Sequence, residues 1–193
     1  MKYNSDKAVA NLYQKQKLFF NTQVTQNTAF RIQKLKALMK EIQRQEKDIY
    51  KALNNDLRKS SFESMTSETV LVEKEIGKMI QMLPLWNRPY RAKSSLINFP
   101  SKDYIISEPY GNTLIISPWN YPFQLAITPL VGAIAAGNTV VLKPSEFAPH
   151  TATVIQSIIE AVFDEGHVAV VKGDASTATM LLKKKWEYIR FTG

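Results

Sequence analysis

The segment GNTLIISPWNYPF at residues 111–123 decides the fold, because its apolar run TLIIS is followed at once by a turn with two prolines. A short run of this kind, 113–117, suits a strand that is buried on both faces. Similar runs follow at residues 139–142 (TVVL), 168–171 (VAVV) and 188–191 (YIRF). Helical patterns fill the intervals, at residues 123–136, 148–163 and 176–184. This alternation predicts an α/β fold with a parallel sheet and right-handed crossovers.

Polar residues follow each of the four predicted strands. In parallel sheets of this kind, ligands bind beyond the carboxyl ends of the strands. We therefore expect a site formed by residues 117–120 (SPWN), 143–146 (KPSE), 172–174 (KGD) and 192–193 (TG). The glycine patterns GxGxxG and GxxxxGK[ST] are both missing from the sequence, so a nucleotide would need other contacts than the usual glycine-rich loop.

Lys143 and Glu146 stand at the end of the second predicted strand, three residues apart. A lysine and a carboxylate so placed can bracket a ribose, with the ammonium donating to one hydroxyl and the carboxylate accepting from another. A structural role fits as well: Ser145 would cap the next helix, and Glu146 would meet the positive end of its dipole. The four residues alone leave both interpretations open.

Asn120 lies between Trp119 and Tyr121 in a turn that prolines flank on both sides. Since proline fixes its own backbone torsion, the amide side chain of this turn could be held in one direction. An amide N–H aimed at a carbonyl oxygen is an oxyanion-hole donor. The alternative is that Asn120 only caps the helix whose first position is Pro122.

Residues 1–110 contain a single glycine, Gly77, and have mostly helical patterns. We expect a first helix from a cap at Ser5 or Asn4 towards Phe20. A second is expected from residues 27–28 to 53 with one apolar stripe, and a third from 64 to 83, where Pro84 would stop it. Asp174 and the Gly137-Asn138 pair are expected to cap later helices.

Residues 84–110 carry four prolines, which exclude long helices there. Short strands are expected at residues 94–99 and 104–108. This strand pair (about 94–110) would project from the body as an arm and pair with another subunit.

The composition excludes several classes of protein. Residues 1–100 carry 18 Lys and Arg against 9 Asp and Glu, whereas residues 101–193 carry 7 against 8. The basic residues alternate with acidic and amide side chains on helical faces, so we expect no nucleic-acid partner. We expect no membrane span, no secretory signal and a cytoplasmic location. The chain has no cysteine, and His150 and His167 lack a third ligand for a metal site.

Several segments, in order along the chain, resemble the aldehyde dehydrogenase superfamily. They are PWNYP (118–122), PLVGAIAAGN (129–138), VVLKPSE (140–146), VVKGD (170–174) and YIRFTG (188–193). Upstream, FRIQKLKALMKEI (30–42), EIGKMIQMLPLW (75–86) and DYIISEPYGN (103–112) resemble its class-3 or fatty-aldehyde branch. The resemblance covers nearly the whole chain.

This resemblance implies a division of the chain and an activity. Residues 1–86 would be the helical part of a coenzyme-binding domain, 87–110 a linker and strand pair of the oligomerisation element, and 111–193 a Rossmann-like NAD(P)-binding half. The family oxidises an aldehyde to a carboxylic acid with NAD(P)+ through a cysteine thiohemiacetal and thioester. The complete enzyme would be a homodimer.

The resemblance also implies roles for individual residues. Asn120 matches the family asparagine that stabilises the oxyanion, and Lys143 and Glu146 match residues that bind the adenosine ribose. A Glu146 carboxylate on the ribose favours NAD, although NADP remains possible because class-3 relatives use both. The other residues expected to line the coenzyme groove are Ser117, Trp119, Gly173, Thr192 and Gly193.

One feature departs from the family. The sequence ends at Gly193, where the family would continue to its glutamate base and its cysteine nucleophile, and no cysteine occurs anywhere. We therefore expect an N-terminal portion of a longer enzyme, or a truncated product, that is inactive alone. The alternative function is a non-catalytic remnant that binds nucleotide or acts as an interaction fragment.

Overall fold

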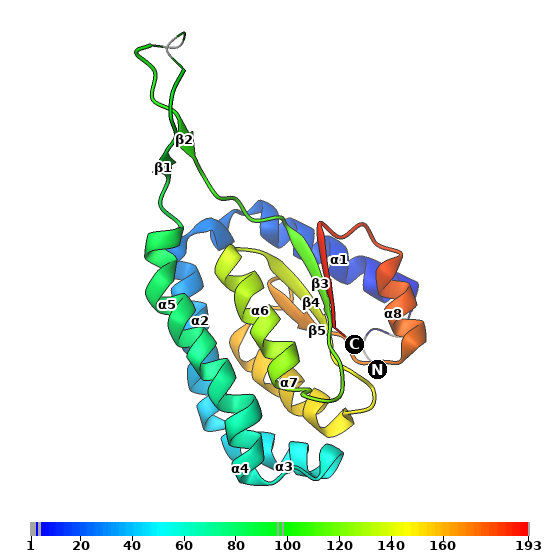
Figure 1. The fold of residues 1–193 in the computed structure, drawn as a ribbon. Helices are drawn as coiled ribbons and strands as arrows, with labels where there is room; N and C mark the ends of the chain where they lie inside the picture. The colour runs from blue at the N-terminus through cyan, green and yellow to red at the C-terminus, as the bar shows by residue number, and fades with distance from the viewer. Residues whose placement is uncertain (1–2, 4, 96, 98, 193) are drawn as a thin grey trace.

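The computed structural model describes residues 3, 5–95, 97 and 99–192. Its centre is a four-stranded parallel sheet with the strand order β5-β4-β3-β6 (Figure 1). The strands are β3 (Asn112–Ile116), β4 (Thr139–Lys143), β5 (Val168–Val170) and β6 (Tyr188–Phe191). Numbered along the chain, this order is that of the first four strands of a doubly wound sheet. The predicted β-α-β-α-β-α-β alternation is confirmed.

Helices cover both faces of the sheet. The three helices that follow β3, β4 and β5 are α6 (Gln124–Ala136), α7 (Pro149–Val162) and α8 (Ala175–Leu182). Ile115 and Leu142 belong to the core that contains α6 and α7, whereas Leu114 and Val141 pack with α1 and α8. Successive strand residues therefore face opposite layers, which explains why apolar residues follow one another in the middle of β3 and β4.

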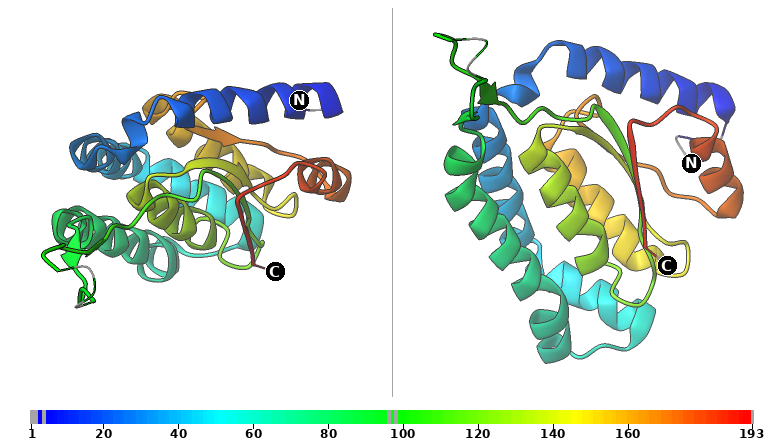
Figure 2. Two further views of the ribbon diagram at one scale, coloured as in Figure 1. Left: turned by 90° about the horizontal axis from the view of Figure 1, so that it is seen from above. Right: turned by 45° about the horizontal axis from the view of Figure 1, so that its top comes forward.

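The N-terminal residues form most of the helical layers. The elements are α1 (Asp6–Asn21), η1 (Val24–Gln26), α2 (Thr28–Arg44), α3 (Glu46–Leu57), α4 (Ser61–Ser64), η2 (Met65–Thr69) and α5 (Val70–Trp86). Helix α1 lies across one face of the sheet, and α2 and α5 pack over α6 on the other (Figure 2). Ser5 caps α1 and Asp174 caps α8, as the sequence predicted, and Asn27 caps α2.

Two expectations for these helices were wrong. The predicted helix over residues 28–53 is two helices, because Gln45 leaves the helical conformation at φ −97° and ψ 13°. Pro84 lies inside α5 rather than stopping it. A proline removes one N–H donor, but here it falls in the last turn, and Asn87 still donates to the Leu83 carbonyl at 3.0 Å.

Residues 87–110 form a hairpin that projects from the body (Figure 1). Its strands are β1 (Tyr90–Arg91) and β2 (Tyr104–Ile105), paired antiparallel. The strand predicted at residues 94–99 is wrong: residues 94, 95, 97 and 99 are not in a strand, and residues 96 and 98 lie outside the described residues. Pairing ends early because the Ser94 hydroxyl, rather than a backbone carbonyl, accepts from the Asp103 N–H.

His167 is a buried titratable group in the core between α1, α2 and α7. Its ring stacks on Phe19 at 5.4 Å between centroids and meets Phe163 edge-on at 5.3 Å. Burial, and then the charge of Lys34, lower the pKa of His167 to about 4, against a smaller opposite effect of Asp164. The imidazole is therefore neutral in the folded protein at neutral pH.

We predict that this histidine makes the chain acid-sensitive. Between about pH 6.5 and about pH 4 the unfolded state binds a proton that the folded state excludes, so stability falls as the pH falls by up to about 3 kcal/mol. Urea unfolding at a series of pH values measures this. His167→Leu should flatten the pH dependence, whereas His150→Gln, at an exposed histidine, should leave it unchanged. An equal pH dependence in His167→Leu and the parent would contradict the prediction.

Candidate functional site

The residues that follow the parallel strands meet at one edge of the sheet. The Ser117 N–H donates to the Lys143 carbonyl at 3.1 Å, which joins the ends of β3 and β4. The Val171 N–H donates to Leu142 at 2.9 Å, and the Thr192 N–H donates to Ile116 at 3.1 Å. The four loops therefore begin side by side, as the parallel topology predicts.

Lys143 and Glu146 form an ion pair at this edge. The Lys143 Nζ lies 2.9 Å from Glu146 Oε2 and 3.3 Å from the Pro144 carbonyl. The Lys143 side chain is only 3% exposed, whereas Glu146 is 33% exposed. Burial raises the pKa of the Glu146 carboxyl, but the hydrogen bond and the charge of Lys143 outweigh it, so the pKa lies below its ordinary value. The Glu146 carboxylate is therefore ionised and partly exposed to solvent, and the buried Lys143 ammonium holds it in place.

The structural alternative for this segment is wrong. Helix α7 begins at Pro149, and its N-cap Ala148 has no side-chain hydrogen bond. Ser145 instead accepts from the Phe147 N–H at 3.2 Å, within the loop. Glu146 therefore lies before the helix rather than in its first turn.

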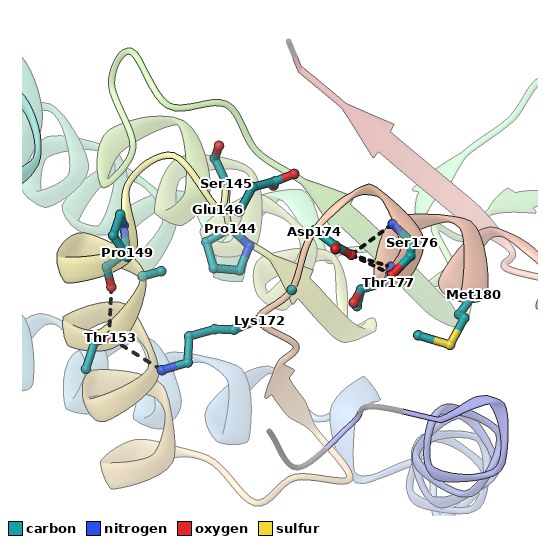
Figure 3. A pocket seen from close by; sticks show the side chains of 12 residues that line it. Pro144, Ser145, Glu146, Pro149, Thr153, Lys172, Asp174, Ser176, Thr177 and Met180 are labelled. Carbon is teal, nitrogen blue, oxygen red and sulfur yellow. Dashed lines mark hydrogen bonds between the residues drawn. The ribbon is translucent and has the colours of Figure 1, made fainter.

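A cavity of about 470 Å³ opens beside this ion pair (Figure 3). Its size is within the range of small-molecule sites. Glu146, Lys172 and Asp174 bring charge to its wall, and the Lys172 Nζ lies 3.4 Å from Thr153 Oγ1. The remaining lining residues are Pro144, Ser145, Pro149, Ala152, Thr153, Gly173, Ser176, Thr177 and Met180.

Gly173 brings the loop after β5 against the start of α8. A Cβ at this position would meet the Thr177 hydroxyl and lie 2.7 Å from the Thr177 Cβ, and the φ is +157°. No other residue fits without moving the helix. Gly173 thus shapes the cavity wall through the close approach of its backbone.

Asn120 lies in the turn between β3 and α6. Its side chain is exposed and makes no hydrogen bond with the described residues. It does not cap α6, so the capping alternative is wrong. The Glu68 carboxylate caps that helix instead, accepting from the Phe123 N–H at 3.1 Å and the Gln124 N–H at 2.8 Å. Sequence reasoning missed Glu68, because no local pattern links residues more than fifty positions apart.

The other predicted site residues lie near the same edge but outside the cavity. Ser117 is buried with no partner for its hydroxyl among the described residues, and Trp119 is 53% exposed. Thr192 follows β6, next to the end of β3. None of these three, nor Asn120, lines the cavity. Gly193 lies outside the described residues.

The described part of the chain has neither a metal-binding cluster nor a helix suited to cross a membrane. No three His, Cys, Asp or Glu residues there are grouped so that they could hold a metal ion. No helix there combines the length and the apolar character that a membrane crossing requires.

The strand order places this chain among the doubly wound α/β proteins, in which ligands generally bind beyond the carboxyl ends of the strands. Residues 2–193 match the aldehyde dehydrogenase family, and the chain belongs to that family. This confirms the resemblance drawn from the sequence.

Relatives of the class-3 branch support this membership. 4,4'-Diaponeurosporen-aldehyde dehydrogenase of Staphylococcus aureus is 43% identical over 177 residues, covering 92% of this chain and 39% of that protein. Family 3 member H1 of Arabidopsis thaliana is 41% identical, covering 95% and 38%. The solved structure described as the substrate-bound state of Staphylococcus aureus AldH is 40% identical with a TM-score of 0.92, covering 95% and 40%. The chain thus spans about 40% of the length of these relatives.

Gly173→Ala should destabilise the chain by roughly 1–3 kcal/mol, because the added methyl group forces α8 away from the cavity wall. Denaturant unfolding followed by circular dichroism measures the change.

Gly77→Ala is the matched control, since a Cβ at Gly77 meets nothing within 4 Å and the position lies inside α5. There alanine should be neutral or stabilise the chain by up to about 1 kcal/mol. Equal stability of Gly173→Ala and the parent would contradict the tight contact.

Proposed function

We propose that this chain is the coenzyme-binding, N-terminal part of an aldehyde dehydrogenase that oxidises an aldehyde to a carboxylic acid with NAD(P)+. The observation that carries the proposal is a ligand-sized cavity lined by Glu146, whose carboxylate is held by the buried ammonium group of Lys143. Family membership supplies the reaction class. The whole reaction is a proposal, because the chain spans less than half of its relatives.

The donor set at the cavity fits the ribose of a dinucleotide. Glu146 presents an ionised, partly exposed oxygen that can accept from a ribose hydroxyl. Lys143 lies behind it and does not line the cavity, so its ammonium group would have to turn from Glu146 or the Pro144 carbonyl to donate to a second hydroxyl. Gly173 lines the cavity and lets the loop after β5 pack tightly against Thr177 at the start of α8. When bound, the coenzyme accepts the hydride that leaves the substrate.

We favour NAD over NADP for this site. A 2′-phosphate would meet the Glu146 carboxylate, and like charges at that distance repel. The ammonium group of Lys172, on the opposite wall, offsets part of that repulsion, so NADP remains possible. A dog relative that is 40% identical is named a dimeric, NADP-preferring aldehyde dehydrogenase.

Asn120 is our candidate for the oxyanion donor. Its turn begins at the end of β3, and its amide is exposed and not engaged by any described side chain. A preorganised amide N–H there would stabilise the negative charge that develops on an aldehyde oxygen. Ser117, Trp119, Thr192 and Gly193 would complete the walls of the groove at this end.

This chain does not contain the kind of nucleophile that the family reaction uses. The family reaction needs a cysteine thiolate, and this chain has no cysteine. That absence favours the second candidate function, a fragment that binds nucleotide without turnover. In either case we propose a cytoplasmic protein whose projecting hairpin, with exposed Tyr90 and Tyr104, contacts a second subunit in a homodimer.

Titration calorimetry of the 193-residue chain tests the coenzyme site. Glu146→Gln should weaken NAD+ binding by about tenfold, because a charge-assisted hydrogen bond to ribose is lost. It should also reduce the preference for NAD+ over NADP+, since the repulsive charge is gone.

Glu160→Gln is the matched control, an exposed carboxylate on α7 that does not line the cavity. It should leave both affinities unchanged. Equal NAD+ affinity of Glu146→Gln and the parent would contradict the proposed hydrogen bond between Glu146 and the ribose.

The purified chain should give no aldehyde-dependent formation of reduced coenzyme, because it has no thiol nucleophile. A spectrophotometric assay with short and long aliphatic aldehydes checks this. A positive control is a complete class-3 enzyme assayed in the same buffer. Turnover by this chain would mean that another residue acts as the nucleophile.

A further inference from the structure

Lys59 and Glu68 form a buried ion pair that contacts the turn containing Asn120. The Lys59 Nζ lies 2.5 Å from Glu68 Oε1, and the two side chains are 7% and 0% exposed. Lys59 follows α3 and Glu68 lies in η2, so both belong to the N-terminal helical segment.

Both members of the pair reach into the turn between β3 and α6. Glu68 uses its second oxygen to accept from the Phe123 and Gln124 N–H groups. The Lys59 Nζ donates to the Asn120 carbonyl at 3.1 Å and lies 4.1 Å from the centre of the Tyr121 ring. Together the pair contacts the backbone on both sides of Pro122.

These contacts act on a turn that its prolines fix only in part. Pro118 and Pro122 fix their own φ angles, which leaves residues 119–121 as the adjustable part. The Asn120 side chain has no partner among the described residues, so the position of its amide is set by the backbone that carries it and by its own rotamer. Lys59 holds that backbone at the Asn120 carbonyl itself.

The chemistry of the pair suits this task better than apolar packing. Apolar side chains could fill the same space, and burying two charges is costly. Apolar side chains could not, however, accept hydrogen bonds from two N–H groups and donate one to a carbonyl. Charge-assisted hydrogen bonds are shorter and stronger than neutral ones, and the Glu68 charge also meets the positive end of the α6 dipole.

We propose that Lys59 and Glu68 are positioning residues that fix the direction of the Asn120 amide at the carboxyl end of β3. The catalytic consequence rests on the proposed function, in which Asn120 stabilises an oxyanion. The positioning itself is a property of the folded chain and can be measured without turnover.

The chain contains a matched control for this role. Asp56, at the end of α3, caps α7 in the same long-range manner: its carboxylate accepts from the His150 N–H at 3.1 Å and the Thr151 N–H at 2.7 Å. A loss of this cap destabilises a helix start of the same kind but does not touch the Asn120 turn.

The experiment is amide hydrogen exchange by NMR on the 193-residue chain and its variants. In the unsubstituted chain, the Phe123 and Gln124 amides should exchange at least about tenfold more slowly than those of Trp119 and Tyr121. In Glu68→Gln and Lys59→Met that protection should fall by about tenfold or more, and the two side-chain amide signals of Asn120 should broaden or shift.

Asp56→Asn should instead affect the amides of His150 and Thr151 and leave the Asn120 signals in place. The proposal is overturned if Glu68→Gln keeps the protection of Phe123 and Gln124, or if Asp56→Asn disturbs Asn120 equally. If neither variant folds, the exchange rates of the unsubstituted chain decide: amides at 123–124 that exchange as fast as those at 119 and 121 refute the contact.

Calorimetry with NAD+ on the same samples separates this proposal from the proposed function. Suppose that the Asn120 side-chain signals broaden or shift in Glu68→Gln but no sample binds NAD+. This result would contradict the coenzyme site and support the positioning role. NAD+ binding together with an unperturbed Asn120 in Glu68→Gln would support the coenzyme site and overturn the positioning role.

Discussion

The burial of parallel strands on both faces is the constraint on which the structure depends. Strands β3, β4 and β5 are buried along almost their whole length and need a helical layer on each side. Parallel pairing requires each connection to return to the starting edge, so every strand ends at the same edge of the sheet. The packing of the core and the location of the site therefore have one cause.

The N-terminal helices do more than cover the sheet. They place two carboxylates, Asp56 and Glu68, at the starts of α7 and α6, the helices that follow β4 and β3. These helix starts border the two halves of the proposed site, the ribose end at Glu146 and the oxyanion end at Asn120. The main core also joins α2, α3 and α5 to α6 and α7. Scaffold and site are thus held by the same contacts.

Features that depend on neighbours in the sequence were predictable, whereas features that depend on distant residues were not. The strands at 113–117 and 139–142 follow from apolar runs, and the Lys143–Glu146 pair spans three positions. The Glu68 cap of α6 and the short pairing of β1 with β2 depend on contacts that no local sequence pattern encodes. The break at Gln45 is similar, since the apolar stripe continues across it from Ile42 to Ile49.

The two lysine–carboxylate pairs differ in what their charges are free to do. Glu146 is a third exposed, and its pKa is held below the ordinary value, so it remains an anion that a ligand hydroxyl can approach. Glu68 has no exposed surface, and burial raises its pKa against the hydrogen bonds from Lys59, Gln124 and Phe123. Its oxygens are already committed to those donors. The partly exposed Glu146 carboxylate can accept from a ligand as well as from Lys143. The buried Lys59–Glu68 pair can only hold the backbone, because leaving either of its charges unpaired is costly.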